Sequence, residues 1–473
     1  MTGLDNTNFP AHIFRAYDIR GNLNDFSPTV VAAIATALSR LYLSHHVKQV
    51  VLGYDARLTS PSYAVICATI LAQQGIEVVE LGCCSTPMMY FCAAQTAGNG
   101  IMITASHNPK TDNGVKWLCQ GMPPSPEQIQ AVARDAKQVP SFNTDLARPQ
   151  ITDHVQTHFS QHYLNYLQQD IQIKRPLHIV VDGLHGSAGQ YAIEILTRLG
   201  CKMTALRCEA NGNFPEHAPD PSQDMHLNTL QQQVLSTQAD LGFALDGDGD
   251  RVVMVDETGQ IIRADRLLCL FAQMCLQQQP EHEIVFDVKC SSQVREWVEQ
   301  HHGIATMIRT GSTFLRQYIA QSKKAIFGGE YAGHYVFNDG RGRGYDDGLY
   351  AALRVIEFVS EQSQSFSAFM QQIPQRYSTQ DCYISTHHYP SRALLSLIEQ
   401  NCQHLQASLS KIDGIRLDFK DGFGIIRASN TGEYLTVRFD ADTPARLAQI
   451  RQDFAQIFTL QYPEIATEIR QAH

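Results

Sequence analysis

The sequence predicts three similar α/β domains followed by a C-terminal α+β domain. The chain has 473 residues, and at about 100–200 residues per domain three or four domains are expected. A strand–helix–strand pattern recurs along the chain up to residue 308. The C-terminal part instead combines strand-like runs with separate helices, which is typical of α+β domains.

The first strand–helix–strand unit is preceded by a clear helix start. Ser27 provides an N-cap, and Pro28 occupies the first helical position, with apolar residues at helical spacing after it. Residues 49–52 form a β-branched run, a helix is expected from residue 60 to about residue 75, and residues 76–81 predict the next strand. A helix between two such strands implies parallel pairing through a right-handed crossover.

Two more units of this kind follow, and a different pattern comes after them. The expected strands and helices of these units are residues 177–181, 189–199, 201–206, 284–288, 291–301 and 304–308. In the C-terminal part, the expected strands are 382–385, 415–419, 423–427 and 434–439, and the expected helices are 391–409 and 444–458. One sheet containing all these strands would be unusually large, so separate domains are favoured.

Breaks in these patterns predict the domain boundaries. Candidate joints lie at residues 140–149, at residues 250–256 and at Pro374. The expected domains are residues 1–148, 149–253, 254–373 and 374–473.

Charge and hydropathy exclude several classes of partner. Asp and Glu outnumber Lys and Arg by 47 to 37, so the net charge is −10, and no basic cluster compensates for it. Binding to nucleic acid or to an anionic membrane is therefore not expected. The longest apolar runs, residues 30–38 and 64–72, have about half the length that a membrane span needs.

The N-terminus and the cysteines favour a cytoplasmic protein. Residues 1–10 have neither a basic start nor an apolar stretch, so no signal peptide is expected. The 12 cysteines show no C-x-x-C spacing. Scattered reduced thiols are the expected state for such a chain.

A loop rich in aspartate predicts a metal site. Asp246-Gly-Asp248-Gly-Asp250-Arg251 lies between two strand-like runs, and three carboxylates at alternate positions of a tight loop suit Mg²⁺. An EF-hand would also place Asp at these positions, but it needs glycine where Arg251 stands and helices as flanks. A solvated acidic turn without a cation is disfavoured because the three carboxylates repel one another.

Three other loops carry polar residues suited to sugar phosphates. Thr104-Ala-Ser106-His107-Asn108-Pro109 follows a strand and offers a serine as nucleophile or phosphate carrier, although an ordinary polar turn is an equal alternative. Arg427-Ala-Ser429-Asn430-Thr431-Gly432 can form a phosphate nest, or it is a surface hairpin. Gly329-Glu330-Tyr331-Ala332-Gly333-His334 can bind sugar hydroxyls, although such Glu and His residues are more often structural.

Taken together and in order, these loops resemble the α-D-phosphohexomutase superfamily, most closely its bacterial phosphomannomutase/phosphoglucomutase members. The resemblance spans the chain. Its further motifs are Phe14-Arg15-Ala16-Tyr17-Asp18-Ile19-Arg20-Gly21, Gly53-Tyr-Asp55-Ala-Arg57, Lys116, Asn211-Gly-Asn-Phe-Pro215, Pro219-Asp-Pro221 and Asp287-Val-Lys289-Cys290.

The resemblance implies four domains arranged around a central cleft, each contributing one functional loop. Ser106 would carry the phosphoryl group, and the metal ligands would be Ser106, Asp246, Asp248 and Asp250 around Mg²⁺. The other expected catalytic residues are Arg20, His107, Lys116, Arg251 and His334. The expected substrate-binding residues are Tyr17, Lys289, Glu330, His334, Arg427, Ser429, Asn430 and Thr431.

The implied reaction interconverts hexose 1-phosphates and 6-phosphates of mannose and glucose through phosphoserine and a 1,6-bisphosphate. Glucose or mannose 1,6-bisphosphate would act as activator, and a monomer or weak dimer is expected. Two departures leave the sugar open, because the family usually has serine at Ala332 and its bispecific members commonly have histidine in the Thr310-Gly311-Ser312 stretch. The alternatives are a phosphoglucosamine mutase, a metal-assisted phosphatase using Ser106, and a non-catalytic sugar-phosphate-binding protein.

Overall fold

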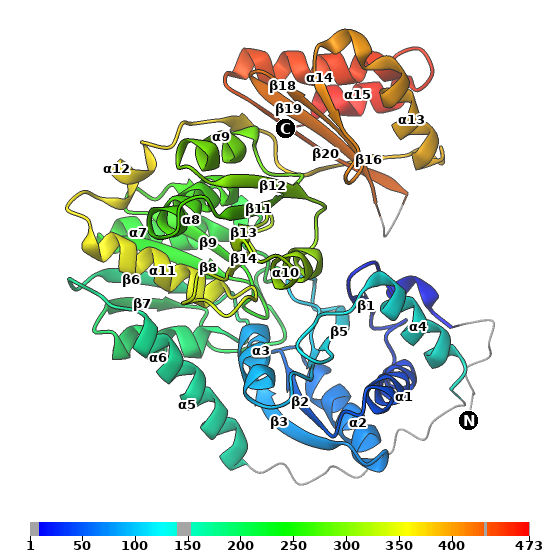
Figure 1. Ribbon diagram of the computed structural model, residues 1–473, viewed down its shortest axis with the longest axis vertical. Coiled ribbons are helices and arrows are strands. Elements are labelled where there is room, and N and C mark those ends of the chain that lie inside the picture. Colours follow the sequence, from blue (N-terminus) through cyan, green and yellow to red (C-terminus); the bar gives the residue numbers. More distant parts are fainter. Residues whose placement is uncertain (1–8, 140–152, 430–432, 473) are drawn as a thin grey trace. The chain divides into compact units, whose positions relative to one another are not determined.

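The protein is described here by a computed structural model, which covers residues 9–139, 153–429 and 433–472 (Figure 1). It contains two compact units, each described by itself. The first unit comprises Met1–Arg263 and Ala332–Phe369, and the second comprises Ala264–Tyr331 and Met370–His473. The predicted class, α/β parts followed by a C-terminal α+β part, is confirmed.

The N-terminal sheet of the first unit has the strand order β1-β5-β4-β2-β3. Strand β2 pairs in parallel with β3 and β4, as the strand–helix–strand pattern predicts, whereas β5 pairs antiparallel with β4 and β1. The elements are η1 (Ala11–Ile13), β1 (Ile19–Asn22), α1 (Pro28–Ser44), β2 (Gln49–Tyr54), α2 (Ser60–Gln73), β3 (Glu77–Cys83), α3 (Thr86–Gln95), β4 (Gly100–Ile103), β5 (Asp112–Leu118) and α4 (Pro126–Lys137).

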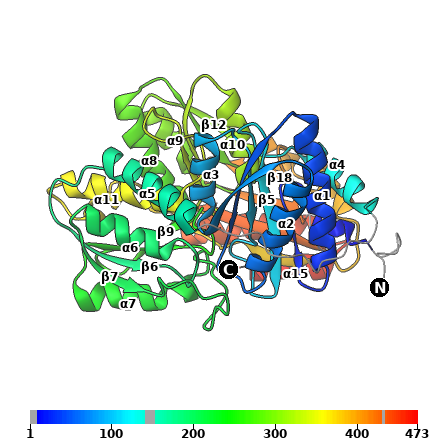
Figure 2. The ribbon, with the colours of Figure 1, turned by 90° about the horizontal axis from the view of Figure 1, so that it is seen from below.

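Helices α1 and α2 lie side by side (Figure 2) and share one apolar core with the sheet. The predicted start of α1 is confirmed, because the Ser27 side chain accepts a hydrogen bond from the backbone N–H of Val30 and Pro28 follows as the first helical residue. This shared core fixes the positions at which β2 and β4 end. It thereby also fixes the starting points of the loops that follow these two strands.

The other sheet of the first unit has the order β10-β9-β8-β6-β7. Strand β6 pairs in parallel with β7 and β8, and β9 pairs antiparallel with β8 and β10. The elements up to β10 are α5 (Asp153–Asp170), β6 (His178–Asp182), α6 (Gly189–Arg198), β7 (Lys202–Leu206), η2 (Asp224–Leu227), α7 (Asn228–Thr237), β8 (Leu241–Leu245), β9 (Val252–Asp256) and β10 (Ile261–Ile262). Strand β9 continues through the predicted boundary between residues 253 and 254.

A later segment of the chain returns to this sheet. Its helix α11 (Gly348–Glu361) packs against β8 and β9, whereas its strand β14 (Tyr335–Phe337) is not part of this sheet. The Arg341 side chain forms an ion pair with Asp170 at the end of α5, with Nη2 and Oδ2 3.1 Å apart. Helix α12 (Phe366–Met370) follows. The return places His334 and Asp346 in the same unit as the aspartate loop.

The second unit contains a parallel and an antiparallel sheet. Strand β11 pairs in parallel with β12 and β13, and the C-terminal strands pair antiparallel around β19 and β20. The elements are α8 (Ala264–Gln278), β11 (Glu283–Asp287), α9 (Ser292–Gln300), β12 (Ile304–Ile308), α10 (Ser312–Gln321), β13 (Ala325–Gly329), β15 (Tyr377–Ser378), β16 (Cys382–Ser385), α13 (Ser391–Asn401), η3 (Gln403–Leu405), β17 (Ser408–Ser410), β18 (Ile415–Phe419), β19 (Gly422–Ala428), β20 (Tyr434–Ala441), α14 (Pro444–Phe458) and α15 (Pro463–Gln471).

The predicted helix at residues 391–409 is too long. Helix α13 ends at Asn401, a short 3-10 turn follows, and Gln406 adopts a left-handed conformation with φ of 50°. Leu409 then lies in β17, opposite Leu417 of β18. Pairing with a neighbouring strand outweighs the helical pattern there, because a helix through Leu409 would leave the edge of β18 unpaired.

All 12 cysteines lie among the described residues, and each is free of a disulfide. Among the described helices, none combines the length and apolarity that a membrane crossing requires.

Candidate active site

The loop that carries Ser106 connects β4 to β5, and one buried arginine binds its backbone carbonyl groups. Arg57, 1% exposed, donates from its guanidinium to the carbonyl oxygens of Ser106 at 2.7 Å, Asn108 at 2.7 Å and Pro109 at 2.6 Å. Asp55 accepts from Arg57 Nε at 3.0 Å and so orients the guanidinium. Ser106 itself has a positive φ of 53°, a strained conformation that these contacts maintain.

The structure places the Ser106 hydroxyl against the aspartate loop. Its Oγ donates to Asp246 Oδ2 at 2.7 Å, although the two residues are 140 positions apart. On the other side, His107 Nδ1 lies 3.1 Å from the same oxygen. Burial and the nearby cations, Arg251 and Arg20 foremost, hold the pKa of His107 well below its usual range. The imidazole beside the serine is therefore neutral.

The aspartate loop connects β8 to β9 and is shaped by its own backbone. Asp246 Oδ1 accepts from the backbone N–H groups of Gly249 at 3.0 Å and Arg251 at 3.2 Å. Gly249 has a φ of +76°, and a Cβ there would come within 2.6 Å of the Ala188 Cβ. Glycine is therefore required at this position, and it turns the flanking carboxylates toward one side.

Lys116 and Thr86 contact the two remaining aspartates. Lys116 Nζ lies 2.6 Å from Asp248 Oδ2 and 2.5 Å from Asp250 Oδ2. The Thr86 hydroxyl, at the start of α3, donates to Asp248 Oδ2 at 2.6 Å. Thr86 and Lys116 both come from the N-terminal sheet region. The aspartate loop is therefore braced by residues distant from it in the sequence.

The three aspartates fit a divalent cation. Their carboxylates can each offer one oxygen within 4.8 Å of the others. Asp248 Oδ1 and Asp250 Oδ1 are buried and accept no hydrogen bond in the described part of the chain, although His334 Nδ1 lies 3.7 Å from Asp250 Oδ1. Buried, unpartnered carboxylate oxygens are costly unless a cation or a donor reaches them. Oxygen ligands of this kind suit Mg²⁺.

The charges of this site are strongly coupled. Burial and repulsion from Asp250 and Asp248 raise the pKa of Asp246 well above its usual range. Burial opposes ionisation of Asp250 too, but Lys116 and His334 outweigh it and lower the pKa of that carboxyl. Lys116 keeps a raised pKa despite its burial because of Asp248 and Asp250. A divalent cation would favour release of the proton from Asp246.

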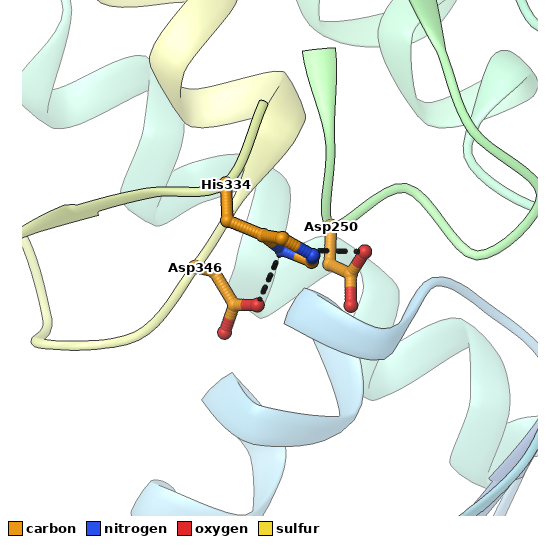
Figure 3. Close-up of side chains that lie close together, drawn as sticks. All are labelled: Asp250, His334 and Asp346. Carbon is orange, nitrogen blue, oxygen red and sulfur yellow. Dashed lines mark ion pairs between the residues drawn. The ribbon is translucent and has the colours of Figure 1, made fainter. Parts of the chain in front are cut away.

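His334 lies beside two carboxylates, those of Asp250 and Asp346 (Figure 3). Its Nδ1 is 2.8 Å from Asp346 Oδ2 and 3.7 Å from Asp250 Oδ1, and its Nε2 accepts from Arg251 Nε at 2.9 Å. Burial lowers the pKa of His334, but Asp250 and then Asp346 raise it above its ordinary value. The charge of Asp250, the larger of these two contributions, is one that a bound divalent cation would neutralise.

Arg20 and Tyr17 lie at the edge of the same region. Arg20 Nε pairs with Asp18 Oδ2 at 2.6 Å, and its Nη1 donates to the carbonyl of Ala105 at 3.3 Å, next to the serine. Burial would lower the pKa of Arg20, but Asp18 keeps it raised. Burial, followed by the charge of Asp18, raises the pKa of Tyr17.

Four predicted substrate-binding residues belong to the second unit. Lys289 Nζ pairs with Asp381 Oδ2 at 2.6 Å. Glu330, 2% exposed, accepts a hydrogen bond from the backbone N–H of Gly311. Arg427 Nη2 pairs with Asp413 Oδ2 at 2.7 Å, and the Ser429 N–H donates to the Tyr434 carbonyl at 3.0 Å. Asn430 and Thr431 lie outside the described residues.

Asp413 links the phosphate-binding candidate to a neighbouring loop. Its Oδ2 accepts from the backbone N–H of Thr310 at 3.0 Å as well as from Arg427. Thr310 also donates through its hydroxyl to Asp287 Oδ2 at 2.8 Å. Lys289 and Arg427, the two basic residues predicted to bind substrate in this unit, are each paired with a carboxylate.

The sequence assigned no role to several residues that shape the site. Arg57 and Asp55 were recognised only as parts of an ordered motif. Thr86 looked like an ordinary residue at a helix start, and Asp346 and Asp413 gave no local signal. Their contacts join positions distant in the sequence, so no spacing rule could have found them.

Comparison with known proteins finds matches along most of the chain. Four family models match in order, namely the phosphoglucomutase/phosphomannomutase alpha/beta/alpha domains I (residues 11–142), II (158–259) and III (263–377) and the C-terminal domain (391–457). The chain is 36% identical to a phosphomannomutase/phosphoglucomutase of Pseudomonas putida over 96% of this chain and 97% of that protein. It is 34% identical to a phosphoglucomutase of Neisseria gonorrhoeae over 94% of this chain and 96% of that protein.

A solved structure from Burkholderia thailandensis, of a phosphoglucomutase/phosphomannomutase family protein, aligns with a TM-score of 0.87 at 33% identity and covers 97% of this chain and 99% of that one. The four matched domains and the relatives thus define a sugar-phosphate mutase. The chain belongs to the phosphoglucomutase/phosphomannomutase family. Both the family resemblance and the enzyme class that the sequence predicted, a phosphohexomutase, are confirmed.

Proposed function

We propose that this protein interconverts the 1-phosphates and 6-phosphates of mannose and glucose, with Ser106 as the phosphoryl carrier. The observation that supports this proposal is the contact between Ser106 Oγ and Asp246 Oδ2 at 2.7 Å. It brings a hydroxyl nucleophile to a triple-carboxylate loop, and Lys116 adds positive charge beside it. Phosphoryl transfer depends mainly on such positioning and charge stabilisation.

In the proposed cycle, the bond between phosphorus and Ser106 Oγ breaks while a bond forms to the free O6 or O1 of a hexose phosphate. The product of this step is a 1,6-bisphosphate. The sugar hydroxyl loses its proton, and Oγ gains one; neutral His107, whose Nδ1 lies 3.1 Å from Oγ, would relay this proton by accepting one at one ring nitrogen while it releases one from the other. The bisphosphate then returns its other phosphoryl group to Ser106, which leaves the isomeric monophosphate.

We propose Mg²⁺ as the cation of Asp246, Asp248 and Asp250, with an oxygen on Ser106 completing the set. When bound, it supplies positive charge beside the transferring phosphoryl group. Two Aspergillus fumigatus N-acetylphosphoglucosamine mutase structures with the same fold contain magnesium with GlcNAc-6P, in one case (TM-score 0.59), and glucose 1,6-bisphosphate, in the other (0.57). They make a 1,6-bisphosphate intermediate a reasonable proposal for this chain.

The second unit is proposed to hold the sugar and its non-reacting phosphate. Glu330 would contact hydroxyls, and Lys289 would add positive charge. The phosphate would be bound by Arg427, Ser429, Asn430 and Thr431. None of the residues assigned to hydroxyls distinguishes the epimers at C2. Strong discrimination arises when a wrong substrate leaves buried polar groups unpaired.

The decisive measurement is a set of initial rates on the 1-phosphates of mannose, glucose, glucosamine and galactose, with trace 1,6-bisphosphate. We expect mannose and glucose to be turned over with kcat/KM values within about 100-fold of each other, the scale of weak discrimination. Galactose 1-phosphate should be much poorer, since it misplaces the C4 hydroxyl. If the kcat/KM values for mannose and glucose 1-phosphate differed by more than about a thousandfold, another residue would have to distinguish the configuration at C2.

Two controls separate the alternatives. Release of free phosphate in step with substrate loss would indicate a phosphatase, and preferential turnover of glucosamine 1-phosphate would indicate a phosphoglucosamine mutase. Intact mass should show a phosphorylated fraction that disappears in Ser106→Ala. Full turnover by Ser106→Ala would contradict the proposed carrier, and absence of any turnover by the wild type would favour a binding protein.

A further inference from the structure

We infer that His334 acts in catalysis by holding the guanidinium of Arg251, and that Asp346 holds His334 in the tautomer that this task requires. His334 and Asp346 are then positioning residues, and His334 does not exchange a proton with the substrate. This inference rests on the proposed function, because the group that Arg251 serves is the transferring phosphoryl group.

The backbone sets His334 and Arg251 side by side. The two residues form an antiparallel bridge, and the neighbouring Val252 N–H donates to the Gly333 carbonyl at 3.2 Å. Gly333 has a φ of +91°, and a Cβ there would come within 3.0 Å of the Val252 carbonyl oxygen. The close approach of the two segments therefore depends on that glycine, and it brings both side chains to the same side.

The contact with Arg251 determines which nitrogen of His334 carries the proton. An arginine Nε–H is a permanent donor, so His334 Nε2, 2.9 Å away, must accept. The neutral ring then carries its proton on Nδ1. Nδ1 faces Asp346 Oδ2 at 2.8 Å and Asp250 Oδ1 at 3.7 Å. The carboxylate of Asp346 at 2.8 Å therefore favours a proton on Nδ1.

This arrangement leaves neither ring nitrogen available for substrate. The Nε2 lone pair is occupied by Arg251, and Nδ1 lies between two carboxylates. Both side chains are enclosed, with His334 5% and Asp346 0% exposed. A general acid or base needs a nitrogen within hydrogen-bond reach of the reacting group. Holding Arg251 is the task that the geometry supports.

Arg251 benefits directly from being held at Nε. Its guanidinium is planar, so fixing Nε also fixes the directions of both Nη groups. Within the described ranges those Nη groups make no hydrogen bond, and its backbone N–H donates to Asp246, the carboxylate that also contacts Ser106. The two Nη groups of Arg251, once oriented in this way, can bind two phosphoryl oxygens in a bidentate manner.

Two substitutions at one position separate holding from proton transfer. In His334→Gln the amide oxygen can still accept from Arg251 Nε, but the side chain cannot exchange a proton. His334→Leu has similar bulk and no acceptor. We expect kcat of His334→Gln to stay within about tenfold of wild type and that of His334→Leu to fall at least about a hundredfold, because an oriented charged donor is worth several kcal/mol. Equal losses in two folded variants would overturn the inference.

A second measurement does not depend on turnover. In ¹⁵N spectra of histidine-labelled protein with Mg²⁺ present, the signals of His334 are those missing in His334→Gln. We expect an unprotonated Nε2 and a protonated Nδ1, and a shift toward the other tautomer in Asp346→Asn. Asp347→Asn is the matched control, because asparagine keeps the N-cap of α11 and should leave the spectrum unchanged.

The two measurements also separate this inference from the proposed function. A protonated Nε2 in the wild type would refute the inference whatever the enzyme's activity. A protein with the expected tautomer but no mutase turnover would instead refute the proposed function, and with it the role of His334 in catalysis.

Discussion

At the scale of single residues, the site is defined by charged groups that are buried together. Asp248 shows this most clearly, since it is 0% exposed and one of its oxygens binds both Lys116 and Thr86. The other oxygen has no partner among the described residues. Leaving that oxygen buried without a partner is costly, and a bound cation would offset the cost.

Asp248→Asn therefore tests the metal proposal. Asparagine keeps the shape and an acceptor for Thr86 but removes the charge. We expect kcat to fall at least a hundredfold, because a cation contributes several kcal/mol to charge stabilisation. Steady-state rates with added Mg²⁺ measure this effect. Asp224→Asn, which removes an exposed ion pair with Arg263, should leave the rate unchanged. Wild-type activity that persists in EDTA would contradict the proposal.

Asp347 provides a prediction about pH. Burial raises the pKa of its carboxyl from 3.8 to about 7, so the folded protein retains a proton that the unfolded chain releases above pH 4. The unfolding free energy should therefore decrease as the pH rises from about 4 to 7, by a few kcal/mol from this group, and should level off above 7.

Asp347→Asn should remove this contribution. Urea denaturation at pH 5 and pH 7.5 measures it, with unfolding free energies compared between wild type and variant. Relative to wild type, the variant should be more stable at pH 7.5 than at pH 5. The same difference at both pH values would show that Asp347 does not retain its proton in the folded protein.

At the scale of elements, loops at strand ends are held by side chains from other elements. Arg57, which follows β2, binds three carbonyls of the loop after β4. In the second unit, Asp413 before β18 binds Arg427 of β19 and the loop after β12. Asp413 therefore competes with any anion for Arg427.

Opposite changes in KM should follow from substitution of the two partners. Arg427→Ala should raise KM for glucose 1-phosphate roughly 10- to 150-fold, since a charge-assisted hydrogen bond is worth about 1.5–3 kcal/mol. Asp413→Asn should lower KM, because it removes the competing charge while its amide oxygen can still accept from Thr310. Saturation kinetics measure both. An unchanged KM in Arg427→Ala would place the phosphate elsewhere.

At the scale of the molecule, the compact units do not follow the order of the chain. The second unit combines residues 264–331 with the C-terminal part. Arg416 of β18 donates to the carbonyls of Val288 at 2.6 Å and Cys290 at 2.7 Å, and Arg438 of β20 binds Asp265 at 3.0 Å. Both arginines are buried. The loop that carries Lys289 is therefore supported by the C-terminal sheet.

A chain ending at Pro374 tests this dependence. From the sequence alone, each side of Pro374 could build its own core. The contacts of Arg416 and Arg438 lead us to expect that the truncated chain keeps a cooperative first unit but loses stability in residues 264–331, where buried carbonyls lose their donors. Hydrogen exchange measured by mass spectrometry should show fast exchange in β11 and α9. Unchanged protection there would contradict the expectation.

The amino-acid sequence by itself determined the local structure and the identity of the functional loops. Parallel strands and helix starts such as Ser27-Pro28 follow from periodicity and caps, because these depend on neighbours within a few residues. The loops of Ser106 and Asp246 became candidates through short motifs, and the order of these motifs along the chain gave the family resemblance. The same local rules failed at residues 402–409, where pairing of β17 with β18 ended the helix.

Only the tertiary structure decided which loops contact one another and which atoms of their side chains carry protons. Ser106 and Asp246 are 140 residues apart, and the segment from Ala332 to Phe369 returns to the first unit with His334 and Asp346. Contacts over such separations depend on sheet order and helix packing, which leave no local trace in the sequence. The tautomer of His334 depends on Arg251 and Asp346 together, so it becomes visible only once these three side chains are placed in space.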